Sequence, residues 1–267
     1  MLRQRVISAL ILTPIVLALI YVGGIPWLLT ILVVGVLGWL EMTQLLRRDH
    51  FGVHRTLGLF FIIGAALEAY ARASHLVQPD LLRPLLAGLI VLSLTWALFN
   101  RVERPTTDWS ITVASALYLG FMIGHFVTLR LRPDGLKWLL LAVALTWTND
   151  TMAYFIGSAL GKRPWWPRLS PKKTWEGLVG GTVSTLIAAP LLCSWLFGLS
   201  PWLGLLLGLL IAVADPFGDL AVSLFKRRAQ AKDSSHLIPG HGGILDRLDS
   251  LLFVVPVVTY FALVVMV

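Results

Sequence analysis

The sequence contains little cysteine and little charge. Of its 267 residues, only Cys193 is a cysteine, and 13% are Asp, Glu, Lys or Arg. A single cysteine excludes a disulfide framework. Soluble domains carry about 25% charged residues, so a value near half of that excludes an ordinary soluble domain. The scarcity of charge indicates a membrane protein.

The motifs of several common enzyme and binding classes are also missing. There is no Walker sequence, no GxSxG elbow and no GxGxxG fingerprint. His236 and His241 lack the spacing of zinc ligands, and the short alternating segments of a membrane β-barrel are absent. The net charge of +8 favours contact with anionic lipid headgroups and not with nucleic acid.

Long apolar runs dominate what is present. We expect an all-α integral membrane protein, because helices satisfy their own backbone hydrogen bonds in a bilayer and need about 20 apolar residues to cross it. The first run has no small-residue cleavage site before Pro26 and is expected to be retained as a helix. The nine predicted spans are 6–24, 26–46, 57–73, 82–100, 109–129, 137–159, 177–199, 202–225 and 247–267.

The positions of the lysines and arginines predict the orientation. With a cytoplasmic N-terminus and a periplasmic C-terminus, 17 of the 22 cations fall on the cytoplasmic side, as the positive-inside rule requires. Arg101 and Arg104 are among them, whereas the 130–137 loop is a local exception. We divide the chain into an N-terminal scaffold (1–80), a middle bundle (81–160) and a C-terminal catalytic bundle with two cytoplasmic loops (161–267).

The first stretch that contains candidate functional residues runs from Asn149 to Gly181. Asp150 lies in an apolar span, so we expect a buried ionisable group. Tyr154, Gly157 and Gly161 follow at helical spacing and share its face. Such glycines permit close approach of another helix or a ligand.

The loop after this span is rich in cations. Ser170 followed by Pro171 predicts a helix N-cap with proline in the first position. Lys172 and Lys173 would then lie in the first turn, beside free backbone N–H groups, and form an anion site. The alternative is that these lysines only anchor a span at the cytoplasmic surface.

The second stretch runs from Asp215 to Ser250, between two apolar runs. Asp219 and Ser223 share a helical face with Lys226 and Arg227, and Pro216 predicts a kink. The loop 239–243 holds three glycines whose backbone could hold phosphate oxygens. Asp246 and Asp249 open the last predicted span, three residues apart on one face.

Carboxylates from these stretches predict a site for a hard cation. Asp150, Asp219, Asp246 and Asp249 would supply oxygen ligands, which select Mg²⁺ together with substrate phosphates. The alternative is that these carboxylates, Asp219 and Asp246 included, only pair with the basic loop residues, and for Asp249 and Asp233 the two interpretations are equal. Glu41 and Glu68 stand in apolar runs as well, where a helix-to-helix hydrogen bond and a functional role both remain open.

At these residues the sequence resembles phosphatidate cytidylyltransferases, also called CDP-diacylglycerol synthases. Their signature fits Ser223-Leu-Phe-Lys-Arg, then Lys232-Asp233, then Pro239-Gly-His-Gly-Gly-Ile-Leu-Asp-Arg-Leu-Asp249. The stretch Ser170-Pro-Lys-Lys-Thr-Trp-Glu-Gly177 and the residues around Asp150 also match. The resemblance covers most of 140–267, and the first 100 residues agree only in hydropathy and length. Val222 departs from the pattern, which often has an acidic residue there.

The resemblance implies transfer of the cytidylyl group of CTP to phosphatidate, giving CDP-diacylglycerol and pyrophosphate. It also implies a homodimer in the bacterial inner membrane, with its active site facing the cytoplasm. Asp219 and Asp246 would bind Mg²⁺, with K⁺ as an optional second cation. The implied catalytic residues are Asp150, Lys173, Asp219, Lys226, Asp246 and Arg247. The implied residues for binding CTP and phosphatidate are Ser170, Lys172, Lys173, Thr174, Glu176, Ser223, Lys226, Arg227, Lys232, His241, Gly242, Gly243 and Asp249.

Two other functions fit parts of the pattern. A related membrane nucleotidyl- or phosphotransferase could use the same metal site on a different lipid or polyprenyl acceptor. An anion transporter could use the basic loops as a vestibule. Many transporters contain internal repeats, and none is evident in this sequence.

Overall fold

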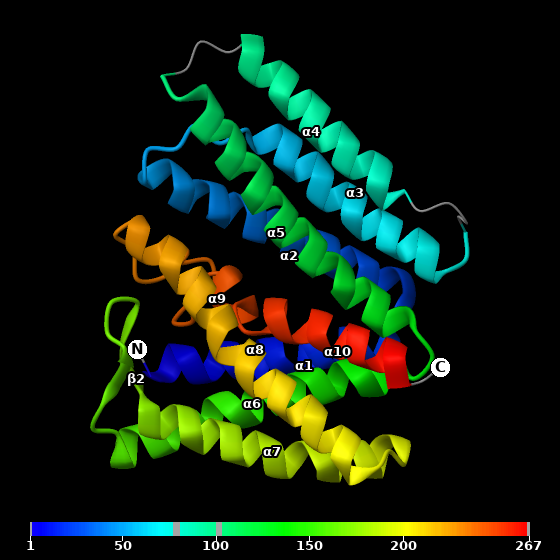
Figure 1. The fold of residues 1–267 in the computed structure, drawn as a ribbon, viewed down its shortest axis with the longest axis vertical. Coiled ribbons are helices and arrows are strands. Elements are labelled where there is room, and N and C mark those ends of the chain that lie inside the picture. The colour runs from blue at the N-terminus through cyan, green and yellow to red at the C-terminus, as the bar shows by residue number, and fades with distance from the viewer. Residues whose placement is uncertain (1, 77–80, 100–102, 266–267) are drawn as a thin grey trace. The chain divides into compact units, whose positions relative to one another are not determined.

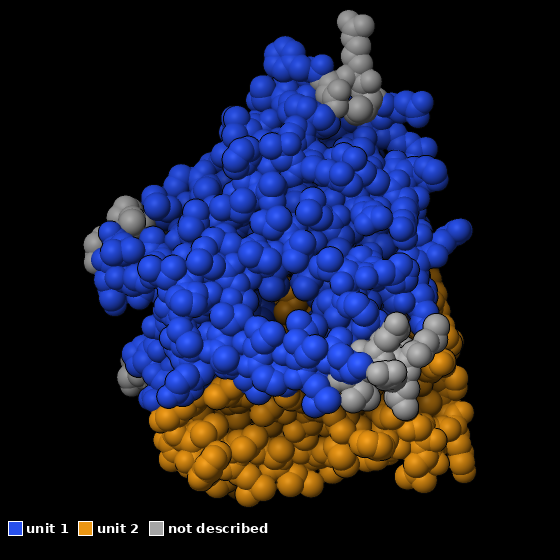
Figure 2. Space-filling model, turned by 180° about the vertical axis from the view of Figure 1, so that it is seen from behind, with its two compact units in different colours: residues 1–136, 225–247 blue, residues 137–224, 248–267 orange. Residues whose placement is uncertain are grey.

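The computed structural model describes residues 2–76, 81–99 and 103–265, with the side chains of residues 2–6 left out. Arg101 and the C-terminal ends of the fourth and last predicted spans lie outside these ranges. The chain forms two compact units: residues 1–136 with 225–247 (unit 1), and residues 137–224 with 248–267 (unit 2; Figure 2). This division by compactness differs from the three functional segments, which stay a prediction.

Helices make up most of the structure (Figure 1). Seven helices of the described chain are long and apolar enough to cross a membrane, and two shorter apolar helices lie near the chain's ends. Each predicted span coincides with a helix, so the protein is a multi-pass membrane protein. The helices are α1 Leu2–Val22, α2 Gly24–Arg48, α3 Arg55–Ala73, α4 Leu82–Phe99, α5 Pro105–Leu131, α6 Gly135–Leu160, α7 Trp175–Phe197, α8 Pro201–Arg228, α9 Leu245–Leu248 and α10 Leu251–Val265.

In unit 1, α3 packs against α2, α4 and α5 (Figure 1). Trp39 of α2 is completely buried, and its indole N–H donates to the carbonyl of Arg55 at 2.8 Å. A Cβ atom at Gly58 would overlap the Trp39 ring. A small residue at this position therefore allows α3 to lie directly on α2, as small residues do in membrane helix pairs.

Unit 2 uses the same device between α6 and α7. A Cβ at Gly177 would overlap the carbonyl of Ala153, and one at Gly181 would overlap the Asn149 side chain. At the other end of these helices, the Trp138 ring stacks on Phe197 with ring centres 3.9 Å apart. The predicted role of the glycines in close helix packing is confirmed.

The structure corrects two expectations about secondary structure. The protein is not purely helical, because β1 Pro164–Trp166 and β2 Ser170–Thr174 form an antiparallel hairpin. The last span begins at Leu251 and not at 247, since the chain turns between α9 and α10. Pro216 lies inside α8, which continues to Arg228, and the kink predicted there stays a prediction.

Candidate active site

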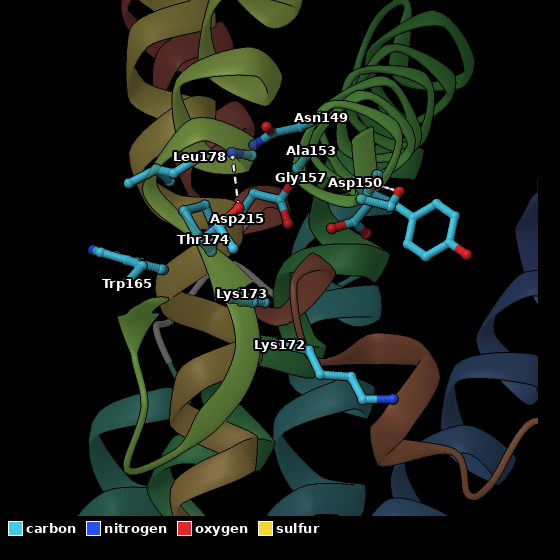
Figure 3. A pocket seen from close by; sticks show the side chains of 14 residues that line it. Asn149, Asp150, Ala153, Gly157, Trp165, Lys172, Lys173, Thr174, Leu178 and Asp215 are labelled. Carbon is cyan, nitrogen blue, oxygen red and sulfur yellow. Dashed lines mark hydrogen bonds between the residues drawn. The ribbon is translucent and has the colours of Figure 1, made fainter. Parts of the chain in front are cut away.

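A cavity of about 420 Å³ lies within unit 2 (Figure 3). Residues from α6, the hairpin, α7 and α8 line it, so it combines the two stretches that the sequence singled out. Its volume is within the range of about 300–1,000 Å³ that is typical of small-molecule sites. The lining residues that bear on the chemistry are Asn149, Asp150, Tyr154, Trp165, Lys172, Lys173, Thr174 and Asp215.

One face of α6 forms a wall of the cavity. Asp150, Tyr154 and Gly157 all line it, which confirms that these three share a face, whereas the prediction is wrong for Gly161, because α6 ends at Leu160. The prediction that Asp150 is buried is wrong, because Asp150 is exposed while the neighbouring Asn149 is buried. The helix turns Asn149 toward Gly181 of α7, and this rotation leaves the Asp150 carboxylate toward the cavity (Figure 3).

The hairpin, and not a helix terminus, presents the two lysines. Ser170 does not cap a helix, and Lys172 and Lys173 lie on strand β2. The cap of α7 is Thr174, whose hydroxyl accepts from the N–H of Gly177 at 3.2 Å. The motif Ser-Pro-Lys-Lys-Thr contains two residues able to cap, and pairing with β1 selects the second. The predicted anion site at the helix terminus is therefore wrong in its geometry.

Glu176 fixes the entry to this hairpin. Its carboxylate accepts from the backbone N–H groups of Lys162 and Arg163 at 3.1 and 3.3 Å. A carboxylate that accepts hydrogen bonds from the backbone in this way orients a loop. Because it is negatively charged, it does not itself attract a phosphate. The contacts indicate that Glu176 fixes the start of the hairpin on which the two lysines lie.

Lys173 pairs directly with the first predicted metal ligand. Its ammonium lies 2.6 Å from Asp219 Oδ2, and the Ser223 hydroxyl donates to Asp219 Oδ1 at 3.2 Å. Both charged side chains are partly exposed, at 29% and 26%. Lys172 also lines the cavity but is more exposed, and its side chain extends away from Asp215 (Figure 3). Unit 2 thus brings Lys173, Asp219 and Ser223 together as predicted.

Asp215 is a residue of this site that the sequence analysis did not select. It is 1% exposed, lines the cavity, and neither of its carboxylate oxygens has a hydrogen-bond partner within the described chain. The Ser250 hydroxyl donates to the backbone carbonyl of Asp215 at 3.2 Å, and the Ser250 and Asn149 side chains also lie close to the Asp215 carboxylate. Its place four residues before Asp219 in an apolar span was the available signal.

In unit 1, Asp246 is the centre of the remaining predicted residues. Its Oδ1 accepts from Lys226 Nζ at 2.7 Å. Its Oδ2 accepts from the Ser234 N–H at 2.7 Å, the Ser234 hydroxyl at 2.8 Å and the Gly243 N–H at 2.9 Å. Burial opposes ionisation, but these hydrogen bonds and the Lys226 charge outweigh it and hold the pKa of Asp246 below its ordinary value of 3.8.

The other predicted residues of unit 1 lie at different depths. Lys226 is buried against Asp246, whereas Arg227, Lys232 and Arg247 are exposed. Gly242 has a φ of +81°, a conformation that favours glycine. The nitrogen Nδ1 of His241 lies 2.7 Å from the Ser8 hydroxyl of α1.

Two acidic residues depart from expectation. Asp249 does not share a helix with Asp246, because it lies in the turn before α10 and accepts from the N–H of Ser250 at 3.0 Å. Glu41 of α2 is buried and accepts four hydrogen bonds from Ser234, Ser235, Ile244 and Leu245. Its position in an apolar run was a signal, but its partners are about 200 residues away, so sequence reasoning could not find them.

The donor chemistry fits a hard cation at single carboxylates. Within the described ranges, no three His, Cys, Asp or Glu side chains form a metal-binding cluster. Asp219 and Asp246 each already accommodate one positive charge, from Lys173 and Lys226, at 2.6 and 2.7 Å. One or two carboxylates with substrate phosphates are the usual ligands of Mg²⁺. The residues therefore fit a metal that is held jointly by protein and substrate.

Comparison with known proteins identifies the family. A model of the cytidylyltransferase family matches residues 3–265. The chain belongs to the cytidylyltransferase family. A phosphatidate cytidylyltransferase of Bacillus subtilis is 33% identical over 266 residues, which cover 98% of this chain and 97% of that protein. The proteins of the same name from Staphylococcus aureus and Staphylococcus haemolyticus are 33% and 32% identical, covering 95% of this chain and 96% of each relative.

The cytidylyltransferase match extends further than the sequence motifs indicated. It includes the first 100 residues, and hence α1 to α4, where only hydropathy and length agreed with the family. The departure at Val222 falls at a fully buried position of α8. This side chain does not line the cavity, so in this cytidylyltransferase an apolar residue fills a place inside the protein.

Proposed function

We propose that this protein transfers the cytidylyl group of CTP to phosphatidate, producing CDP-diacylglycerol and pyrophosphate. A phosphate oxygen of phosphatidate attacks the α-phosphorus of CTP. The new P–O bond forms as the bond between the α-phosphorus and the oxygen bridging to the β-phosphorus breaks, and pyrophosphate leaves. Phosphatidate is anionic at neutral pH, so its attacking oxygen needs no strong general base.

The Lys173–Asp219 pair beside the cavity is the observation that carries this proposal. Phosphoryl transfer depends mainly on positioning and on neutralising the charge that develops. Lys173 lines the cavity while it binds Asp219 at 2.6 Å, so a phosphate in the cavity meets an ammonium that is already fixed. Lys172 adds a second cation from the same strand.

The contacts of the remaining predicted residues change some of their proposed roles. Asp150 faces the cavity, and Arg227, Lys232 and Arg247 offer exposed cations to phosphate groups. Lys226 is bound to Asp246 and is proposed to hold that carboxylate in place. His241, Gly242 and Gly243 shape the loop, whereas Ser170, Thr174, Glu176 and Ser223 hold the cationic residues in position. Asp249 stays a proposed binding residue.

We propose Asp219 and Asp246 as ligands of Mg²⁺, with K⁺ as an optional second cation. When bound, Mg²⁺ would neutralise phosphate oxygens and so stabilise the transition state. The ligands are inferred from their residue type and from the signature. In unit 2, Ser223 orients Asp219, and in unit 1 the donors Ser234 and Gly243 orient Asp246.

The proposed setting is a bacterial inner membrane. Nine spans with a cytoplasmic N-terminus and a periplasmic C-terminus place most lysines and arginines in the cytoplasm, where CTP is available. The active site would face that side, and phosphatidate would enter from the bilayer. The proposed homodimer rests on resemblance to the family.

Incorporation of radiolabelled CTP into lipid tests this function. Purified protein in detergent is incubated with Mg²⁺, CTP and a panel of acceptors: phosphatidate, diacylglycerol and polyprenyl phosphate. We expect label in CDP-diacylglycerol, and equimolar pyrophosphate, with phosphatidate alone. Label in a polyprenyl product would show that the acceptor is different, and no incorporation with any acceptor would refute the enzymatic proposal.

A further inference from the structure

We propose that Glu41 is a positioning residue that fixes residues 234–246, here called the Asp246 loop, and thereby sets the binding of CTP and divalent metal. The inference rests on the proposed function. Glu41 lies near the end of α2 and is 5% exposed. Glu41 lies outside the signature, yet its carboxylate accepts four hydrogen bonds from this loop.

The contacts of Glu41 join the two ends of the Asp246 loop. Oε1 accepts from the Ser235 hydroxyl at 2.6 Å and from the Ile244 N–H at 2.9 Å. Oε2 accepts from the Ser234 hydroxyl at 2.8 Å and from the Leu245 N–H at 2.9 Å. One side chain thus binds the beginning of the loop and the start of α9 simultaneously.

The number of donors requires a carboxylate. A carboxylate has about four acceptor positions on two oxygens, whereas an amide replaces one oxygen by an NH₂ donor. In a Gln variant, that donor would face either Ser235 and the Ile244 N–H or Ser234 and the Leu245 N–H. A backbone N–H opposite another donor is unsatisfied, which is costly in a buried setting.

The same loop atoms connect Glu41 to Asp246. The Ser234 hydroxyl lies 2.8 Å from both Glu41 Oε2 and Asp246 Oδ2. A Cβ at Gly243 would overlap the Glu41 carboxylate and the Ser234 hydroxyl, while the Gly243 N–H donates to Asp246. Displacement of Glu41 therefore moves two residues that orient the Asp246 carboxylate.

The test compares Glu41→Gln with Glu68→Gln. Glu68 is a matched control, because it is also a buried glutamate of unit 1 but pairs with Arg72 on its own helix. We expect Glu41→Gln to raise the KM for CTP and the Mg²⁺ concentration for half-maximal activity by about tenfold, the effect of lost hydrogen bonds to a charged group. The KM for phosphatidate should change less than twofold. Ser235→Ala, which removes one of the four contacts, should give a smaller shift in the same direction.

A second readout does not depend on turnover. Amide hydrogen exchange of Ile244 and Leu245 should accelerate in Glu41→Gln and stay unchanged in Glu68→Gln. CTP affinity measured by calorimetry with Mg²⁺ should fall in parallel. If Glu41→Gln keeps the wild-type KM for CTP and wild-type exchange, the inference is wrong. If both variants lose kcat alike without a change in KM, Glu41 is merely structural and the inference is also wrong.

The wild-type protein separates this inference from the proposed function. Wild type that forms no CDP-diacylglycerol contradicts the proposed function. An active wild type with an unaffected Glu41→Gln variant contradicts only the positioning role.

Discussion

Asp246 in unit 1 and Asp215, which lines the cavity of unit 2, are both buried acids, but their surroundings are opposite. Asp246 receives four hydrogen bonds from Lys226, Ser234 and Gly243. Asp215 has no partner for either carboxylate oxygen within the described residues. An unsatisfied buried carboxylate destabilises the fold. The difference shows that hydrogen bonds within the loop hold Asp246 in place. The presence of a buried acid at position 215, by contrast, is not explained by a contribution to stability.

The lysines follow the same contrast. Lys226 is buried with Asp246, at 9% and 7% side-chain exposure, and this pair is a fixed part of the loop. Lys173 and Asp219 are each more than a quarter exposed, and Lys173 lines the cavity. The ion pair of unit 2 is therefore partly open to solvent, whereas the carboxylate of Asp246 in unit 1 is held by buried neighbours.

The largest effect is expected at Asp219. Asp219→Asn keeps the shape of the side chain but removes the charge that faces Lys173 and, on our proposal, Mg²⁺. Loss of such an electrostatic contribution lowers kcat by about 10²–10³-fold. Transfer of label from CTP to lipid measures it, and Asp233→Asn is the control, because Asp233 is an exposed acid of the signature. Near-normal turnover of Asp219→Asn would refute its role as a ligand.

Asp246→Asn and Asp215→Asn should have opposite effects on stability. Asp246→Asn leaves the buried Lys226 without its counter-charge, which is expected to lower the free energy of unfolding by about 3 kcal/mol. Asp215→Asn removes a buried acid that lacks hydrogen bonds, so its stability should equal or exceed that of wild type. Thermal unfolding in detergent at neutral pH compares the two. Equal destabilisation would remove the contrast between the two acids.

The stability cost of Asp246→Asn should also depend on pH. The pKa of Asp246 is lowered in the folded protein, so its contribution is complete above the ordinary value near 3.8. The contribution is lost as the pH falls through the lower, folded-state pKa. The difference between wild type and Asp246→Asn is therefore expected to be constant from pH 7 to pH 5 and to narrow only in stronger acid. A difference that narrows already between pH 7 and pH 5 would contradict this.

Lys173→Ala and Lys172→Ala should separate the two lysines of the hairpin. Lys173 contacts Asp219, whereas Lys172 is exposed. We expect kcat/KM to fall by about 10–100-fold in Lys173→Ala, since a charge-assisted contact is worth about 1.5–3 kcal/mol, and by less in Lys172→Ala. Steady-state assays with both substrates measure this. Equal, small effects would favour the alternative that both lysines are surface anchors.

The smallest effect is expected at the pair formed by Asp49 and Arg228. Their atoms Oδ2 and Nε lie 3.0 Å apart, but the arginine side chain is 62% exposed. Exposed pairs contribute about 0–1 kcal/mol, so Asp49→Asn should change thermal stability very little. This variant serves as a reference for Asp246→Asn, because both change an acid of unit 1 that pairs with a cation, one exposed and one buried. A loss as large as that of Asp246→Asn would show that burial does not distinguish the pairs.

The sequence predicted the helices well because the bilayer imposes a length on apolar runs. It predicted the family from the residues around Lys173 and Asp246, and the family match confirms this. The hairpin was missed because Ser170 and Thr174 are both suitable caps, and the choice depends on pairing with Pro164–Trp166. The partners of Glu41 could not be predicted because these contacts form only in the folded unit.

Asp150 and Asp249 show a different limit. Helical periodicity correctly placed Asp150 beside Tyr154 and Gly157, but it could not say which side of α6 faces α7. Contacts between Asn149 and Gly181 decide that rotation. The spacing of Asp246 and Asp249 assumed a continuous helix, whereas the chain turns at Ser250. Periodicity predicts neighbours within a helix but not where a short helix ends.

The aromatic side chains of the hairpin have an optical consequence. Trp165 lines the cavity and its ring contacts Trp166, Trp175 and Phe217, with ring centres 6.0, 6.1 and 5.8 Å apart. An indole that lines a cavity changes its emission when the nearby charge or water content changes. The difference in fluorescence between wild type and Trp165→Phe therefore reports occupancy of the cavity without any label. Trp165 fluorescence can therefore be used, without an added label, to measure the order in which the proposed substrates bind.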